Sequence, residues 1–309
     1  MTELHVRCPL CQAVGARHYL AVQSYSIVQC FLCGFLFVSP PPDADALAAF
    51  YQQESYYIGS AFGYQDYFAQ RPSHERDARR RLGIIEQLTQ QRGQLLDVGC
   101  AAGFFLHVAQ RRGWQPAGVE LSSSMAAFAA DLVHCPIVAR TDQLMGAPAT
   151  FDVITFWEYI EHIPDPYAEL CRLVPLLRPG GILALSTPNT RYWTAVHRPD
   201  RWREFKPPAH IGFFTTRTLR RLIEMAGLEV VLIRKVFPRA PSHPYLLQRL
   251  LLLLKARVGN GADRRTRVWW SFSIMWRVVE RLSQLGYRVR WPSSDVGLCL
   301  EVYARKPVL

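Results

Sequence analysis

The stretch from Leu95 to Gly103, which runs LLDVGCAAG, decides the fold. Its first four residues are mostly apolar and predict a buried strand, and the small residues that follow predict a tight turn into a helix. Gly99 and Gly103 lack a Cβ, so a ligand can approach the backbone closely there. The first turn of the helix offers unpaired N–H groups. The stretch therefore predicts a ligand-binding loop between a strand and a helix.

An acidic residue, Glu120, stands near the end of the next predicted strand, residues 115–121. A carboxylate at this place can accept hydrogen bonds from both hydroxyls of a ribose. Its separation from Gly99 is about that expected between the glycine loop and the acid of a dinucleotide site. The loop and the acid together predict a nucleoside site at the carboxyl ends of the strands.

Strands and helices alternate on both sides of this stretch. We expect helices at 74–92, 104–112, 122–132, 167–177 and 216–226, and strands at 94–98, 115–121, 136–139, 151–157, 182–186, 228–236 and 296–304. This alternation predicts the α/β class, with a mostly parallel sheet that helices cover on both faces.

Taken together, these motifs resemble the class I S-adenosylmethionine-dependent methyltransferases. The resemblance spans roughly residues 75–235 and rests on the loop and Glu120, on Phe151–Ile154 and on Leu177–Gly181. It implies a Rossmann-like sheet with an antiparallel last strand and S-adenosyl-L-methionine as cofactor. The loop would lie under the methionine part, Glu120 would hold the ribose and Asp142 would meet the adenine. The implied cofactor-binding residues are Asp97, Gly99, Cys100, Ala101, Gly103, Glu120, Leu121, Asp142 and Trp157.

Two alternatives stay open for this loop. A nicotinamide-dependent dehydrogenase binds a pyrophosphate and usually has three glycines in the pattern G-x-G-x-x-G, whereas this loop has two. The loop can also be a glycine turn without a ligand. The accompanying motifs favour the methyltransferase.

The segment 157–166, WEYIEHIPDP, follows a predicted strand and marks the catalytic end of the sheet. If residues 158–162 turn helically, Glu158, Glu161 and His162 share one face. The segment resembles the Glu-His-x-x-x-Pro segment of ubiquinone-type O-methyltransferases and their sugar-modifying relatives. His162 is then a candidate general base, because its ordinary pKa lies near neutrality. Alternatively, the acid–acid–His face holds a divalent metal, as in some similar enzymes, or His162 only packs a turn.

A second catalytic candidate is His210, in the segment 207–215, PPAHIGFFT. Similar enzymes place this segment over the active site, before the helix predicted at 216–226. His210 either contacts the acceptor or is a loop histidine that hydrogen bonds satisfy.

Two Cys-x-x-Cys pairs stand near the N-terminus, Cys8 with Cys11 and Cys30 with Cys33. Two thiolates on one tight turn can occupy two corners of a tetrahedron, and the second pair completes it. The spacing predicts a structural zinc site that a module this small needs in order to fold. The alternative is a hairpin whose cysteines bind no metal.

The domain organisation follows from these motifs. We expect a zinc-binding module at 1–40, a helical linker and cap at 41–93, and a methyltransferase domain at 94–309 with a basic helical insertion at 238–292. Eleven Arg or Lys against two acids lie between residues 239 and 290, so most of the net charge of +11 is there. Residues 245–290 also contain several tryptophans, so this segment either forms a lid over the acceptor or contacts a membrane surface.

The remaining composition limits the choice of function. The N-terminal residues lack the apolar core of a secretory signal, and no stretch has the length of a spanning helix. We therefore expect a cytoplasmic enzyme, with the inner membrane face as an alternative location. The predicted function is methyl transfer to a small-molecule acceptor, such as a hydroxyl of a sugar, a lipid-linked compound or a secondary metabolite. An RNA methyltransferase and a non-catalytic module that binds zinc and anions are the alternatives, and nucleic acid is not an expected partner.

Overall fold

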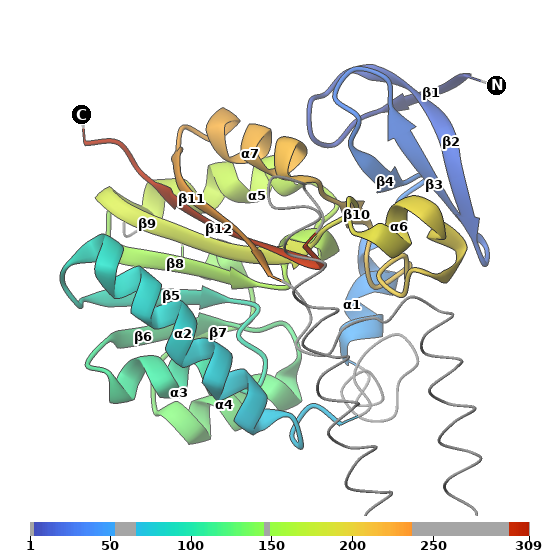
Figure 1. Cartoon of the computed structure of the whole chain (residues 1–309). Helices are drawn as coiled ribbons and strands as arrows, with labels where there is room; N and C mark the ends of the chain where they lie inside the picture. The colour runs from blue at the N-terminus through green and yellow to red at the C-terminus, as the bar shows by residue number, and fades with distance from the viewer. Residues whose placement is uncertain (1–2, 53–65, 145–148, 237–296, 309) are drawn as a thin grey trace, which may run out of the picture.

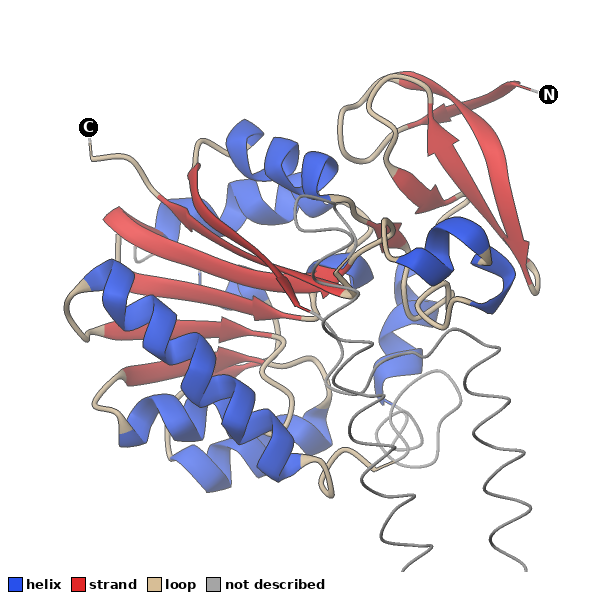
Figure 2. Cartoon of the chain, in the orientation of Figure 1, coloured by secondary structure: helices blue, strands red, loops and turns tan. Residues whose placement is uncertain are grey.

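The computed structural model describes residues 3–52, 66–144, 149–236 and 297–308. The basic segment 238–292, predicted as an insertion, lies outside the described residues, so its predicted lid or membrane role keeps the status of an expectation. Figures 1 and 2 show a large sheet with helices on two faces and a smaller sheet near the N-terminus.

The large sheet has seven strands in the order β11-β12-β9-β8-β5-β6-β7. Neighbours from β7 to β9 pair in parallel, and β12 pairs antiparallel with both β9 and β11. This arrangement confirms the predicted α/β class and the antiparallel last strand. The strands are β5 (Gln94–Val98), β6 (Gln115–Val119), β7 (Ile137–Val138), β8 (Phe151–Trp157), β9 (Leu177–Pro188), β11 (Glu229–Val236) and β12 (Cys299–Arg305).

Helices cover both faces of this sheet, because successive side chains of a buried strand point to opposite faces. Leu95 joins an apolar core with the helices on one face, and Leu96 joins a second core with those on the other. The first face carries α2 (Arg71–Thr89), α3 (Phe104–Arg111) and α4 (Ser123–Val133), and the second carries α5 (Pro166–Leu173) and α7 (Thr216–Met225) (Figure 2).

Strand β9 is longer than the predicted strand at 182–186 and begins at Leu177. Leu177 pairs with Phe151, and the register then shifts before Ile182 pairs with Val153. Gly180 takes a φ of +78° inside this irregular part, a backbone conformation that glycine adopts without strain. Residues 178–181, which precede the predicted strand, are thus part of β9 and form a bulge in it.

The N-terminal residues form the smaller, antiparallel sheet. Its strands run in the order β1-β2-β3-β4-β10. The first four are β1 (Glu3–Arg7), β2 (Val14–Val22), β3 (Tyr25–Cys30) and β4 (Leu36–Val38). The fifth, β10 (Gly212–Phe213), comes from far along the chain. Sequence reasoning ended this unit at residue 40 and did not foresee the fifth strand.

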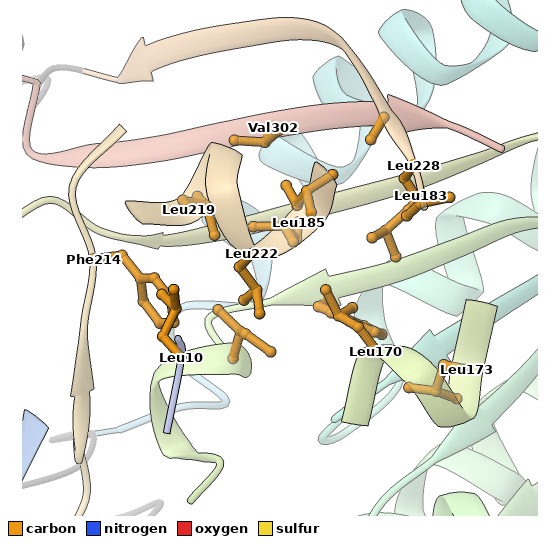
Figure 3. Packing of buried hydrophobic residues seen from close by; sticks show 14 of the residues in the cluster. Leu10, Leu170, Leu173, Leu183, Leu185, Phe214, Leu219, Leu222, Leu228 and Val302 are labelled. Carbon is orange, nitrogen blue, oxygen red and sulfur yellow. The ribbon is translucent and has the colours of Figure 1, made fainter. Parts of the chain in front are cut away.

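The small sheet shares an apolar core with one face of the large sheet. Leu10 is fully buried in the same cluster as Phe214, Leu219 and Leu222 (Figure 3). The short helix α1 (Ala44–Gln52) follows the small sheet. In the described part of the chain, no helix is both long and apolar enough to cross a membrane.

Candidate functional site

The loop after β5 contains three residues with left-handed backbone. The φ angles of Gly99, Ala101 and Gly103 are +75°, +46° and +73°. A Cβ on Gly99 would lie 2.7 Å from Cδ2 of Tyr159, and a Cβ on Gly103 would lie 2.9 Å from that of Ala129. Glycine at 99 therefore lets Tyr159 approach the loop, and glycine at 103 lets α3 and α4 pack closely.

The carboxylate of Glu120 holds this loop in place. Its Oε2 accepts a 2.8 Å hydrogen bond from the backbone N–H of Ala101, and its Oε1 accepts one of the same length from Ser122. Glu120 is 6% exposed, and it stands one residue beyond the end of β6. The predicted acid thus lies beside the predicted loop, at the carboxyl end of the parallel strands.

Two other predicted residues of the loop region face inward. Asp97 is buried and accepts a 2.6 Å hydrogen bond from the hydroxyl of Thr155, and burial raises the pKa of its carboxyl to about 7. Burial likewise raises the pKa of the Cys100 thiol. Neither residue lines the cavity in front of the loop.

A cavity of about 330 Å³ opens in front of this loop. It reaches from the glycine loop to the segment after β8, which was predicted to be the catalytic end. The predicted residues that line it are Gly99, Ala101, Glu120, Leu121, Asp142, Trp157, Glu158 and His162.

Asp142 and Trp157 lie in different surroundings within this cavity. Asp142 is exposed, and its carboxylate forms a 3.2 Å ion pair with Arg140. Trp157 ends β8, and the guanidinium of Arg81, on α2, lies 4.1 Å from the centre of its ring. This distance is within the range of a cation–π interaction.

The predicted helical face of Glu158, Glu161 and His162 does not form. Glu158 has a φ of +54°, and only Ile160–His162 forms a single 3-10 turn. The left-handed residue breaks the regular spacing on which the shared face depended. Glu158 instead accepts a 2.7 Å hydrogen bond from the hydroxyl of Ser186, on β9.

A different group of three residues comes together. Glu161, His162 and His210 each offer one ligand atom, and these atoms lie within 4.8 Å of one another. Neither carboxylate oxygen of Glu161 has a hydrogen-bond partner within the described residues. Burial, followed by the charge of Glu158, raises the pKa of Glu161 well above its usual range.

Two oxygen atoms lie within hydrogen-bond distance of one ring nitrogen of His162. Its Nδ1 lies 2.6 Å from the carbonyl oxygen of Ala209 and 2.7 Å from the hydroxyl of Tyr51, which itself donates to Ala209 at 2.8 Å. A carbonyl oxygen only accepts, so the contact with Ala209 favours the tautomer that carries the proton on Nδ1. Burial lowers the pKa of His162 to about 4, so the ring is neutral at physiological pH.

His210 packs against the ring of His162 and does not line the cavity. Its ring centroid lies 4.8 Å from that of His162, and its Nδ1 lies 3.1 Å from the carbonyl oxygen of Glu204. It is 3% exposed and does not line the cavity. Burial and the charge of Lys206 lower the pKa of its imidazole. The structure therefore places His210 against His162 rather than in the cavity wall.

Several cavity residues were missed by sequence reasoning. Tyr51 comes from α1 and Tyr67 from the stretch before α2, both within the segment 41–93, which was predicted only as a helical linker and cap. Their signal was the density of tyrosines, which says nothing about direction. The others that line the cavity are Val119, Ala139, Arg140, Thr141, Tyr159, Glu169 and Arg172.

The four predicted metal ligands lie together in the small sheet. The Sγ atoms of Cys8 and Cys33 are 3.7 Å apart, those of Cys11 and Cys30 are 3.6 Å apart, and all four lie within 4.8 Å of one another. A tetrahedron with Zn–S bonds of about 2.3 Å has edges of about 3.8 Å. The donor set and its spacing therefore fit a zinc ion.

Comparison with known proteins gives three kinds of match. A family model described as a methyltransferase domain matches residues 67–233. The ubiquinone biosynthesis O-methyltransferase of Idiomarina loihiensis is 32% identical over 171 residues, which are 50% of this chain and 69% of that protein. The protein of the same name from Cupriavidus pinatubonensis is 29% identical over 184 residues, 55% of this chain and 74% of that protein.

A solved structure shows the same fold. The SAM-dependent methyltransferase from Archaeoglobus fulgidus superposes with a TM-score of 0.52 at 16% identity, and the match covers 76% of this chain and 94% of that chain. At this level of identity the superposition concerns the fold alone.

Proposed function

We infer the function of this chain from its family: it belongs to the methyltransferase domain family and is a class I S-adenosylmethionine-dependent methyltransferase. We propose that it transfers a methyl group to a hydroxyl of a small-molecule acceptor. One observation carries this proposal: a single cavity is lined both by the glycine loop with Glu120 and by His162. The names of the two relatives, both O-methyltransferases, support a hydroxyl as the group that is methylated.

The loop and Glu120 are the residues that would hold the cofactor. Each carboxylate oxygen of Glu120 accepts one backbone N–H, and the residue lines the cavity, so the carboxylate stands where it could accept from the ribose hydroxyls. Leu121, Asp142 and Trp157 complete this part of the cavity wall. The bound cofactor supplies an electrophilic methyl carbon. The chain must hold the acceptor in line with that carbon and take its proton.

His162 is the residue that we propose as the proton acceptor. Its Nδ1–H is fixed on the Ala209 carbonyl, so the proton of the acceptor hydroxyl would move to Nε2. The resulting imidazolium would keep both of its N–H groups as donors. A low pKa makes the ring a weak base, which suits removal of the proton as the methyl–oxygen bond forms rather than before.

The aromatic wall of the cavity supports a ring-shaped acceptor. The cavity volume of about 330 Å³ is in the range of small-molecule sites, and the cofactor would occupy part of it. Tyr51, Tyr67 and Tyr159 supply flat apolar walls with polar tips, which suit a sugar, a lipid-linked ring or a secondary metabolite. The four cysteines, which fit a zinc ion, would hold a structural metal away from this wall.

The test is transfer of a labelled methyl group. The full chain is incubated with S-adenosylmethionine carrying a labelled methyl and with glycan, lipid and RNA extracts in separate reactions. We expect label in a small-molecule product as an alkali-stable methyl ether, and a His162→Ala enzyme that binds cofactor but turns over at least tenfold more slowly. Label in RNA alone would overturn the proposal, and an unchanged His162→Ala rate would remove His162 as the base.

A further inference from the structure

One short segment, residues 209–213, joins the small sheet to the segment after β8. Within it, β10 pairs with β4, Gly212 opposite Phe37 and Phe213 opposite Leu36. The N–H of Val38 also donates a 2.9 Å hydrogen bond to the carbonyl oxygen of Ile211. One edge of the segment is therefore a strand of the small sheet.

The other side of the same segment bonds to the catalytic end. The N–H of Ile211 donates to the carbonyl oxygen of Glu161 at 2.9 Å. Two residues earlier, the carbonyl oxygen of Ala209 accepts from Nδ1 of His162 and from the hydroxyl of Tyr51. Ile211 thus has its carbonyl on the small sheet and its N–H on the residue next to His162.

Apolar contacts also connect the small sheet to the segment 209–213 and the residue after it. The ring of Phe35 lies 4.9 Å from that of Phe214, centroid to centroid. A Cβ on Gly212 would lie 3.2 Å from Cζ of Phe35, so glycine allows this close approach. Leu10, which lies between Cys8 and Cys11, belongs to the same core cluster as Phe214 (Figure 3). Leu10 is next to Cys11 and Phe35 is two residues after Cys33, so the residues that contact the segment belong to the same two turns as the cysteines.

The cofactor side of the cavity is hydrogen-bonded within the large sheet and to α1, where the side-chain amide of Gln52 donates to the carbonyl oxygen of Leu121 at 2.7 Å. Glu120 bonds to Ala101 and Ser122, and Asp97 bonds to Thr155, all within the large sheet and its loops. The hydrogen bonds between the segment 209–213 and the small sheet therefore lead to the half of the cavity that holds His162.

We propose that the four-cysteine sheet positions the acceptor half of the active site, acting through Phe35 and the segment 209–213 to fix the ring of His162. This inference rests on the proposed role of His162. Phe35 and Ile211 are positioning residues, since neither lines the cavity in which the methyl group is transferred. The sheet is then part of the catalytic unit rather than a separate binding module.

The test weakens the packing between Phe35 and the segment 209–213 without replacing a cysteine. Phe35→Ala removes the ring, Phe35→Leu keeps an apolar side chain in its place, and Gly212→Ala places a methyl group against the ring from the other side. Leu32→Ala, at a 63% exposed position in the turn between β3 and β4, is the control. Hydrogen exchange of residues 209–214, cofactor affinity by calorimetry, bound zinc, kcat and KM are measured for each variant.

We expect Phe35→Ala and Gly212→Ala to keep their zinc and to bind cofactor within about twofold of the parent chain. Exchange at residues 209–214 should rise at least tenfold, kcat should fall at least tenfold, and Phe35→Leu should recover most of the loss. Unchanged exchange in Phe35→Ala and Gly212→Ala would overturn the proposal, as would raised exchange with an unchanged kcat. If the parent chain methylates no acceptor, the proposed function fails, and the exchange data with the NMR signal of the His162 ring still show whether the sheet fixes that ring.

Discussion

The carboxylate of Glu120 accepts a 2.8 Å hydrogen bond from the backbone N–H of Ala101. The bond links the end of β6 to the middle of the glycine loop, where Ala101 takes a left-handed φ of +46°. One side chain thus both fixes the shape of the loop and faces the cavity in front of it.

Replacing Glu120 by alanine should abolish measurable cofactor binding, at least a hundredfold loss in affinity, while the chain stays folded. The variant loses the acceptor of two ribose hydrogen bonds, each worth about 1.5–3 kcal/mol when the partner is charged. Calorimetry with S-adenosylmethionine checks the affinity, and circular dichroism checks the fold. Glu229→Ala, at an exposed position of β11, is the control. Equal affinity in both variants would refute the assignment of Glu120.

Acid should destabilise the chain partly through His162. The pKa of the folded ring is lowered to about 4 from an ordinary value near 6.5, so between these values the unfolded chain binds a proton that the native ring does not. The free energy of unfolding contributed by this residue is complete above about pH 6.5 and is lost as the pH falls toward 4. Urea unfolding at pH 7.5 and 5.0 should show a smaller acid loss in His162→Gln than in the parent chain. An equal loss in both would contradict a buried neutral ring.

Replacing Gly99 by alanine should cost more than the backbone strain alone. Gly227 has nearly the same left-handed φ, but a Cβ there would have nothing within 4 Å, whereas a Cβ on Gly99 would meet Tyr159 at 2.7 Å. Gly227→Ala should lose about 1–2 kcal/mol, and Gly99→Ala a further ~1–3 kcal/mol from overpacking. Thermal and urea unfolding of the two variants give the comparison. Equal losses would show that Tyr159 yields without cost.

Replacing Arg81 by glutamine should weaken cofactor binding about threefold to tenfold, because the guanidinium lies over Trp157 in the cavity wall and such contacts contribute about 1 kcal/mol. Arg80→Gln is the matched control. Arg80 and Arg81 both bind the carboxylate of Glu301, but only Arg81 also reaches Trp157 and the hydroxyl of Ser186. The idea fails if calorimetry finds the same affinity for the two variants.

The purified chain should contain one zinc ion that depends on the four cysteines. Cys30→Ser should lose the ion and most of the stability of the small sheet, because the thiolates are the only groups there that could hold it among the described residues. Cys171→Ser, which changes an exposed thiol outside the cluster, should keep its zinc. Elemental analysis of both proteins decides, and zinc retained in Cys30→Ser would exclude this site.

Much of the fold followed from local pattern. The strand predicted at 94–98 matches β5, and the strand predicted at 151–157 matches β8, because a buried parallel strand is a short apolar run between turn residues. The loop and Glu120 were predictable for the same reason, since their spacing follows from one strand–helix–strand unit. The close set of four cysteine thiols was predictable too, because each pair lies within one tight turn.

The acceptor half of the cavity was decided by tertiary structure. Because Glu158 has a left-handed backbone, the predicted Glu158–Glu161–His162 face does not form. The segment 209–213 packs beside this region and places His210 against His162. Tyr51 reached the same ring from a helix more than a hundred residues earlier in the chain. Sequence alone determined the glycine loop and the place of Glu120 beside it, because these parts are near neighbours in the chain and obey local rules of turn and strand. The other side depends on contacts between distant segments, and no local periodicity records where two such segments meet.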